Sequence, residues 1–320
     1  MIVNSERQRL TEQFTIRVSE YKDAIRSTGS GDPKIRKIFR NLKQFGPSYV
    51  LYTLARFNVP GLWGSARGKL FWGRNMVWPA SDIGTHVFSM YGIAHHKSER
   101  RLTRWMINYL KEDDVFYDIG AHLGFYTALS ELIAVHGETH AFEANKKLCD
   151  YLNRNFAGSH TTYISCNAAS DMVGSIDFYD ATRTEDSSAS SRFNISERGT
   201  APFRVPATTI DAYVKAGHRP PTVIKLDIEG GEYEAIVGGS GVIKTYRPAI
   251  IMEVWAGDKG RKYSDKAVRK LQELGYNAFE LGSDGSVSKN PVDDPVGSIK
   301  DASDGARDNF LFITSEQYYE

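Results

Sequence analysis

The sequence lacks the features that would place it in several specialised classes of protein. Only two of its 320 residues are cysteines, too few for a disulfide framework or a four-cysteine zinc site. Its longest apolar stretches have the length of strands and fall well short of the roughly 20 residues that span a bilayer. The formal net charge is +1, so no global basic field points to nucleic acid.

The cysteines and the N-terminal segment set two expectations. Cys149 and Cys166 lie in apolar runs, and free cysteines are among the most often buried residues, so we expect two buried structural thiols. The first 14 residues, MIVNSERQRLTEQF, are charged and lack the apolar core of a secretory signal. Because no spanning segment is present either, we expect a cytoplasmic protein.

Hydrophobic periodicity changes near residue 113. Before this point, Leu10, Phe14 and Val18 follow helical spacing. The region from Asn58 to Asp82 is rich in glycine, proline and tryptophan, which predicts irregular structure with short strands. After residue 113, strands and helices alternate. We therefore predict a helical and mixed N-terminal extension over residues 1–112 and a second domain over residues 113–320.

The second domain contains short apolar segments with the length of buried strands, most of them followed by a helical segment. The predicted strands cover 115–120, 138–144, 162–169, 222–228, 248–255 and 309–314, with a hairpin near 175–180 and 203–210. Short apolar strands alternating with helices form parallel sheets covered on both faces. We predict an α/β fold with a doubly wound, mostly parallel sheet, which binds ligands beyond the carboxyl ends of its strands.

The segment DIGAHLGFYT, from Asp118 to Thr127, joins the first predicted strand to a helix. Its glycines have G-x-x-x-G spacing, which differs from the G-x-G-x-x-G of dinucleotide-binding proteins. Gly120 permits a tight turn, and Gly124 permits close approach of the backbone to a ligand. The N–H groups at the helix start can bind a carboxylate, and Asp118 can accept hydrogen bonds from an ammonium group.

A ligand that carries both groups, such as the methionine part of S-adenosylmethionine, matches this turn. The residues predicted to contact the cofactor in this segment are Asp118, Gly120, Ala121, His122, Gly124, Phe125 and Thr127.

Further cofactor contacts are predicted at the ends of the second and third strands. Glu143 lies roughly 20 residues after the glycine turn, the spacing at which an acidic residue binds ribose hydroxyls. Ala144 and Asn145 follow it directly. Adenine needs a flat apolar slot, and Asn167 and Ala168 at the end of the third strand are placed to form one.

Carboxylates cluster after the fourth strand, in the segment KLDIEGGE from Lys225 to Glu232. Clustered carboxylates repel one another and burial raises their pKa, so such a cluster costs stability and indicates a site. We predict that Asp227 and Glu229 are catalytic and that Asp227 also contacts the cofactor, with Glu253 at the end of the next strand as a third catalytic candidate. Glu232 is equally well explained as a favourable charge at a helix start.

These motifs resemble the FkbM family of methyltransferases over roughly Leu110 to Thr314. The resemblance lies in DIGAHLGFYT, AFEAN, IKLDIEGGEYEAIVGG and RPAIIMEVW, and its most distinctive part is the D-x-E-G-x-E pattern that begins at Asp227. It implies a class I, Rossmann-like methyltransferase that uses S-adenosylmethionine for O-methylation, often of a sugar or polyketide hydroxyl. His122 replaces a frequent asparagine and Ala144 a common proline, and neither change disturbs the cofactor site.

Methylation of an aliphatic hydroxyl requires an acceptor oxygen about 3 Å from the methyl carbon and a group that takes its proton. Besides the three carboxylates, His95, His96 and His122 are alternative bases. Asp227 and Glu253 also offer oxygen ligands for a divalent cation such as magnesium. Because two carboxylates without a third ligand are a weak coordination set, a metal site is not favoured.

The N-terminal extension contains residues that indicate which acceptor and which partners to expect. Its aromatic residues predict either stacking on a sugar ring or packing within a small subdomain. A basic helix predicted over Lys34 to Lys43 is either a solvated face or a peripheral membrane contact. We predict a glycan or small-molecule acceptor; the alternatives are an RNA methyltransferase and a non-catalytic nucleotide-binding module. The aromatic residues in question are Trp63, Trp72, Trp78 and Tyr91.

Overall fold

The computed structural model describes residues 4–26, 46, 49–50, 65–80, 88, 90–94, 96–180, 190–191, 202–300 and 306–318. The chain divides into two compact units. The smaller unit comprises Met1–His96 and Thr182–Ser188, and the larger unit comprises Lys97–Ala181 and Ala189–Glu320. Among the helices described, none is both long enough and apolar enough to cross a membrane.

The smaller unit contains helix α1 (Asn4–Arg26) and an antiparallel pair of strands, β1 (Ser65–Lys69) and β2 (Asn75–Pro79). The structure confirms the predicted N-terminal helix, whose residues Leu10, Phe14 and Val18 are buried.

Aromatic residues form much of the core of the smaller unit. The ring centroid of Phe14 lies 5.1 Å from that of Phe71, and Trp78 and Tyr91 are buried. These contacts favour the packing interpretation of Trp78 and Tyr91 over sugar stacking. Trp63 and the basic helix predicted over Lys34 to Lys43 lie outside the described residues.

The larger unit is built on a seven-stranded sheet with the order β12-β13-β11-β10-β3-β4-β5. Neighbours from β11 to β5 are parallel, and β13 runs antiparallel to both β11 and β12. This confirms the predicted α/β fold with a doubly wound, mostly parallel sheet. The strands are β3 (Val115–Ile119), β4 (Glu138–Phe142), β5 (Thr162–Ser165), β10 (Val223–Leu226), β11 (Ala249–Trp255), β12 (Tyr276–Glu280) and β13 (Arg307–Thr314).

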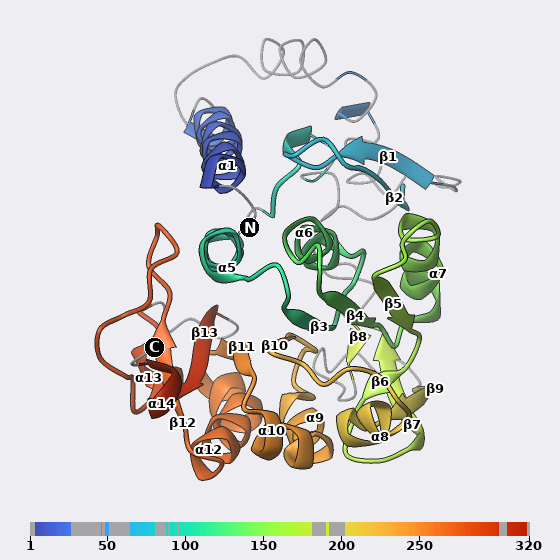
Figure 1. Cartoon of the computed structure of the whole chain (residues 1–320), viewed down its shortest axis with the longest axis vertical. Helices are drawn as coiled ribbons and strands as arrows, with labels where there is room; N and C mark the ends of the chain where they lie inside the picture. Colours follow the sequence, from blue (N-terminus) through green and yellow to red (C-terminus); the bar gives the residue numbers. More distant parts are fainter. Residues whose placement is uncertain are drawn as a thin grey trace. The chain divides into compact units, whose positions relative to one another are not determined.

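Helices cover both faces of this sheet (Figure 1). One face carries α5 (Lys97–Tyr109), α6 (Phe125–Ile133) and α7 (Lys146–Asn155). The other carries α8 (Ile210–Lys215), α9 (Glu232–Gly238), α10 (Ser240–Tyr246) and α12 (Asp265–Glu273). The connections include α11 (Gly257–Lys259), the π-helical turn η1 (Gly260–Ser264), α13 (Pro295–Ser298) and α14 (Ser315–Tyr318).

The two faces of the central strands differ in chemistry although both are buried. Tyr117, Leu226 and Met252 belong to the hydrophobic core on the side of α9 and α12. Successive side chains of a strand point to opposite faces. Asp118 and Lys225 therefore lie on the face toward α6, which contacts both of them through Thr127 and Tyr126. The face toward α6 thus carries the buried charged side chains of Asp118 and Lys225.

A second, four-stranded sheet has the order β6-β9-β7-β8 and confirms the predicted hairpin as the antiparallel pair of β7 and β9. The prediction of one strand over residues 162–169 is wrong, because β5 pairs with β4 whereas β6 leaves the main sheet and pairs with β9. The strands are β6 (Ala168–Ala169), β7 (Gly174–Asp180), β8 (Ser190–Ser191) and β9 (Phe203–Thr208).

The two cysteines form a disulfide bond, which corrects the expectation of two buried thiols. Cys149 on α7 is fully buried, but Cys166 directly after β5 is exposed. Their Cα atoms lie 5.7 Å apart, the usual separation for a disulfide. Apolar neighbours in the sequence predicted burial correctly for Cys149 alone, and they gave no sign that α7 runs back alongside β5.

Candidate active site

The strand order reverses between β3 and β10. From β3 the chain continues outward through β4 and β5, whereas β10 is followed by β11 on the opposite side. Asp118 pairs in register with Lys225, and Ile119 with Leu226, so both strands end at the same edge. Doubly wound sheets bind their ligands at such a switch point. The glycine turn and the acidic segment that begins at Asp227 leave the sheet there.

The two glycines of the turn have different structural roles. Gly120 has a φ of +83°, and a Cβ atom on it would lie 1.8 Å from the carbonyl oxygen of Asp227. Only glycine therefore lets the two segments pass each other so closely. At Gly124, with a φ of +87°, a Cβ atom would lie 2.6 Å from the ring of Phe156. This glycine makes room for α7, although we expected it to admit a ligand.

The N–H groups of the glycine turn are largely used within the protein. Those of Gly120 and Ala121 each donate to the carbonyl oxygen of Phe142 at 3.0 Å. That of His122 donates to Glu143 Oε2 at 2.9 Å. The anion was predicted to bind at the N–H groups of the helix start, and these three groups, which precede that helix, already have acceptors. They hold the turn against the end of β4.

Glu143 is buried, with 8% of its surface exposed, and connects the turn to the start of α7. Its Oε2 accepts from His122, and its Oε1 accepts from the N–H of Asn145 at 2.8 Å. Burial raises the pKa of Glu143 to about 7, and these two hydrogen bonds limit the rise. A carboxylate oxygen has two lone pairs, so each oxygen can accept one further hydrogen bond.

The other predicted cofactor residues lie near the end of β5. Asn145 caps α7, since its Oδ1 accepts from the N–H of Lys147 at 3.0 Å. Asn167 donates through Nδ2 to Ser165 Oγ at 3.0 Å, while Ala168 is buried in β6. An open cavity of about 440 Å³ adjoins this strand end. Its lining includes Asn153, Phe156, Tyr163, Ser165, Asn167, Tyr213 and His218.

Asp118 and Thr127 lie fully buried beneath the turn. Thr127 Oγ1 donates to Asp118 Oδ2 at 2.6 Å, and Lys225 Nζ lies 3.6 Å from Asp118 Oδ1. The structure therefore gives Asp118 partners within the protein, where the sequence predicted an ammonium group of the ligand.

Lys225 connects the turn with the acidic cluster. Its Nζ lies 3.3 Å from Asp227 Oδ2 and 3.5 Å from the carbonyl oxygen of Gly120. Burial lowers the pKa of Lys225, but the charges of Asp227 and Asp118 outweigh this effect and hold the pKa above its usual value. The sequence analysis assigned Lys225 no role. The available signal was a lysine within a strand that is otherwise apolar.

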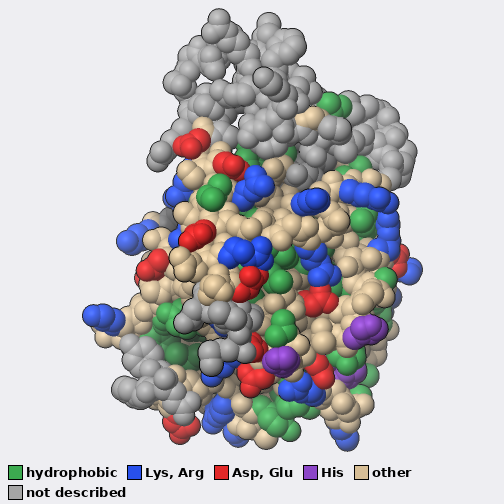
Figure 2. Space-filling model, turned by 45° about the horizontal axis from the view of Figure 1, so that its top comes forward, with side chains coloured by type: hydrophobic (Ala, Val, Ile, Leu, Met, Phe, Trp, Pro, Cys, Tyr) green, Lys and Arg blue, Asp and Glu red, His purple; other side chains and the backbone are tan. Residues whose placement is uncertain are grey.

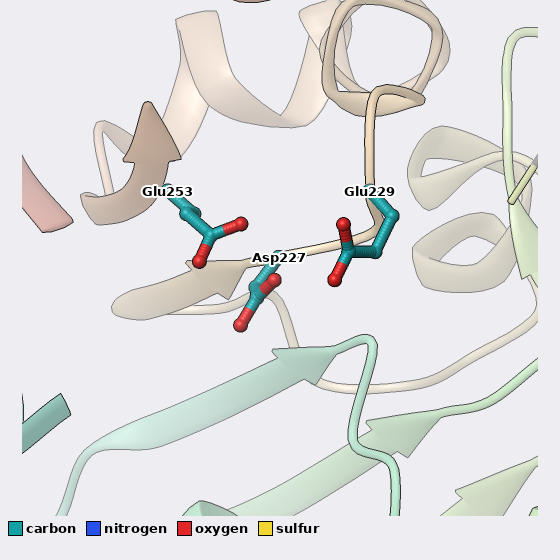
Figure 3. A group of neighbouring side chains, drawn as sticks. All are labelled: Asp227, Glu229 and Glu253. Atoms are coloured by element: carbon teal, nitrogen blue, oxygen red, sulfur yellow. The ribbon is translucent and has the colours of Figure 1, made fainter. Parts of the chain in front are cut away.

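Asp227, Glu229 and Glu253 form the acidic cluster, in which one oxygen atom of each carboxyl group lies within 4.8 Å of the others. Glu253 and Glu229 extend toward Asp227 from opposite sides (Figure 3). Glu253 is buried, whereas Asp227 and Glu229 are half-buried. The structure thus brings together all three predicted catalytic carboxylates.

Glu253 has the most perturbed environment of the cluster. Its Oε2 accepts from Trp255 Nε1 at 2.8 Å, and its Oε1 lies 3.3 Å from Arg307 Nε. Arg307 Nη1 also lies 3.2 Å from Glu229 Oε1. Burial and the charge of Asp227 raise the pKa of Glu253 well above its usual value. Arg307 was missed because it lies on β13, far from any motif in the sequence.

Glu232 holds the segment that carries Glu229. It is 3% exposed, and its Oε1 accepts from the N–H groups of Ile228 at 3.0 Å and Gly230 at 3.2 Å. Burial raises the pKa of Glu232 to about 7. Beyond its position at the start of α9, this carboxyl group therefore fixes the loop after β10.

The three alternative bases are spread over the chain. His122 lies in the glycine turn with a φ of 52°. His95 lies outside the described residues, and His96 belongs to the smaller unit.

The sequence profile of the methyltransferase FkbM domain matches residues 118–278. This chain belongs to the FkbM methyltransferase family. The match starts at Asp118 in the glycine turn and ends within β12, so it contains the turn, Glu143 and the acidic cluster. The chain is therefore an S-adenosylmethionine-dependent methyltransferase with the class I, Rossmann-like fold, as the sequence motifs predicted.

Among curated proteins, the chain is similar to the hexuronic acid methyltransferase AglP of Haloferax volcanii. The two are 26% identical over 173 residues, which cover 53% of this chain and 68% of AglP.

Two solved methyltransferase structures are similar to the chain at low sequence identity. The methyltransferase FkbM of Methylobacillus flagellatus KT has a TM-score of 0.40 and 13% identity, and the alignment covers 87% of this chain and 60% of the other. The precorrin-6y C5,15-methyltransferase of Geobacter metallireducens GS-15 has a TM-score of 0.35 and 14% identity, with 67% and 83% covered.

Proposed function

We propose that this FkbM methyltransferase transfers the methyl group of S-adenosylmethionine to a hydroxyl group of a sugar, within a glycan or a related small molecule. The observation that carries the proposal is the convergence of Asp227, Glu229 and Glu253 directly beside the glycine turn. The similarity to AglP, a hexuronic acid methyltransferase, supports a carbohydrate acceptor.

The cofactor would lie across the carboxyl ends of β3, β4 and β5. Glu143 would accept hydrogen bonds from the ribose hydroxyls; this assignment is supported by the backbone N–H groups that hold both of its oxygens in position. Adenine would extend toward Asn167 and the cavity at the end of β5. The methionine part would then lie over the glycine turn, with the methyl group toward Asp227.

The chemistry needs one proton acceptor. The acceptor oxygen forms a bond to the methyl carbon as the bond from sulfur to that carbon breaks, and the hydroxyl proton leaves. We assign this proton to Asp227, whose side chain is 30% exposed and open to a substrate, whereas that of Glu253 is 9% exposed. Glu229, on the other side of Asp227, would orient the acceptor.

Methyl transfer to a panel of neutral and uronic-acid sugars tests the proposal. We expect the purified protein to bind S-adenosylhomocysteine in calorimetry and to add one methyl unit, seen by mass spectrometry, to at least one sugar. An ether resists mild alkali, whereas a methyl ester of a uronic acid is hydrolysed by it. A product that mild alkali hydrolyses would show that the acceptor is a carboxylate and not a hydroxyl group. Failure to bind the cofactor would overturn the proposal.

Surface charge does not favour the alternative of an RNA substrate. Lys and Arg side chains are interspersed with Asp and Glu over the described surface shown in Figure 2, and the net charge is only +1. RNA-binding surfaces concentrate positive charge on one face.

The cytoplasmic location remains a prediction, and the disulfide bond provides its test. Disulfide bonds persist in oxidising compartments and are rare in a reducing cytosol. Alkylation of thiols in intact cells followed by mass spectrometry should find Cys149 and Cys166 reduced if the protein is cytoplasmic. A fully oxidised pair would favour an oxidising compartment.

A further inference from the structure

The acidic cluster has a geometry that suits a metal ion as well as a proton acceptor. Ligand atoms on opposite sides of a hard divalent cation lie about 4 to 5 Å apart, since each bond to oxygen measures about 2.0 to 2.6 Å. One oxygen from each of Asp227, Glu229 and Glu253 fits within 4.8 Å of the others. From the sequence, only Asp227 and Glu253 were considered as metal ligands. The structure shows that Glu229 is close enough to be a third.

A second, independent observation comes from β13. Asn309 lies directly opposite Glu253 in the antiparallel pair of β11 and β13, and directly opposed residues project from the same face of a sheet. Asn309 is 5% exposed, and its Oδ1 is buried without a hydrogen-bond partner among the described residues. A buried amide oxygen without a donor is unfavourable, and a cation beside Glu253 would satisfy it.

The charges around the acidic cluster also favour a bound cation. Two cationic side chains among the described residues each contact two carboxylates: Lys225 contacts Asp118 and Asp227, and Arg307 contacts Glu229 and Glu253. Carboxylates that share a cation in a buried site still repel one another, and a divalent ion removes that repulsion.

We propose that Asp227, Glu229, Glu253 and Asn309 bind a hard divalent cation of the magnesium class, next to the position where the sugar hydroxyl is methylated. This inference deepens the proposed function and depends on it for the role of the ion. Magnesium has six coordination positions, so the four protein ligands leave two positions that water fills until a substrate binds. These two positions would bind neighbouring oxygen atoms of the sugar, which makes a vicinal diol or a hydroxy acid the favoured acceptor.

The ion would also assist proton removal. A hydroxyl group bound to a divalent cation loses its proton more readily than a free one. Asp227 has two carboxylate oxygens, so it can bind the ion through one and accept the hydroxyl proton on the other.

Manganese binding, measured by electron paramagnetic resonance, tests the site without reference to activity. The full-length protein is stripped with a chelator and titrated with Mn²⁺ alone, and then Mg²⁺ is added as a competitor. We expect one site that Mg²⁺ displaces, and Glu253→Gln should weaken it at least about 10-fold because a charged ligand is lost. The matched control Glu273→Gln, at a side chain that is 65% exposed on α12, should bind Mn²⁺ as the unmodified protein does.

Asn309→Leu separates a ligand role from a structural role. Replacing a buried amide whose Oδ1 has no hydrogen-bond partner among the described residues by an apolar side chain of similar size should leave the melting temperature unchanged or raise it. The same substitution should weaken Mn²⁺ binding several-fold. Normal Mn²⁺ binding by both Asn309→Leu and Glu253→Gln would overturn the inference, as would an absence of binding at millimolar Mn²⁺.

The outcomes also separate this inference from the proposed function. Full sugar methylation in the presence of a chelator, together with no Mn²⁺ binding, would overturn the metal site. The proposal that the enzyme methylates a sugar would then still hold. Displaceable Mn²⁺ binding without transfer to any sugar would support the site and overturn the proposed acceptor.

Discussion

Two non-glycine residues with left-handed backbone conformations lie in the loops of the candidate active site. His122 has a φ of 52° and Glu229 a φ of 55°, a conformation that costs about 1–3 kcal/mol unless the surroundings enforce it. In each loop a buried glutamate accepts backbone N–H groups: Glu143 accepts from His122, and Glu232 accepts from the residues on either side of Glu229. Two buried carboxyl groups therefore hold the strained loops in place.

These two carboxyl groups should make stability depend on pH. Glu143 and Glu232 have a pKa of about 7 in the folded protein against 4.5 for an unperturbed glutamate. The folded form binds protons more tightly, so the free energy of unfolding should fall as pH rises from about 5 to 7, by up to about 3 kcal/mol for each group. Urea unfolding at pH 5 and pH 8 measures this loss.

The variant Glu143→Gln has no carboxyl group to ionise at this position and should lose less stability over the same pH range. Glu273→Gln, at an exposed position, should keep the original dependence. Equal losses in both variants would show that other groups cause the effect.

Glu143→Ala should weaken cofactor binding about 10- to 100-fold, because hydrogen bonds to a charged group contribute about 1.5–3 kcal/mol. Calorimetry with S-adenosylhomocysteine measures the affinity, and circular dichroism checks that the fold is retained. Unchanged affinity would remove Glu143 from the cofactor site.

Asp227→Asn should reduce kcat at least about 100-fold, the usual scale for a positioned base. Its affinity for S-adenosylhomocysteine should change much less, because the proposed ribose contacts are at Glu143. A near-normal kcat would assign the proton transfer to Glu253 or Glu229.

At the scale of elements, the disulfide bond joins α7 to the segment that follows β5. It closes a loop with a sequence separation of 17, for which the chain-entropy model gives about 3 kcal/mol of stabilisation. Urea unfolding of the oxidised protein and of the Cys149→Ser, Cys166→Ser double variant should differ by about this amount. A difference in unfolding free energy below about 0.5 kcal/mol would mean that the disulfide bond constrains neither the folded nor the unfolded state.

The order of elements was largely predictable because strong apolar runs mark the central strands. The prediction failed where the local apolar pattern in the sequence differs from the pairing of the strands in the sheets. Residues 162–169 look like one strand, yet the pairing partner changes from β4 to β9 at Cys166 and Asn167. Strand β12 was missed, because Tyr276–Glu280 mixes buried and exposed positions and adds to the sheet only through β13.

At the scale of the molecule, the sequence predicted those parts of the candidate site that parallel strands bring together. Asp118, Glu143, Asp227 and Glu253 each stand at or next to the carboxyl end of such a strand, and these ends share one edge. Sequence spacing does not reveal that β13 returns antiparallel beside β11. For this reason Arg307 and Asn309, which contact or oppose Glu253, were not predicted.

The position of β13 has a consequence for biosynthesis. The ribosome produces β13 after β12, yet β13 lies between β12 and β11 in the finished sheet. While the nascent chain is still short of Arg307, β12 has no neighbour in the sheet and Glu253 lacks its guanidinium partner. Enzyme competence should therefore require β13, and it should appear only when this strand has left the ribosome and inserts between β11 and β12.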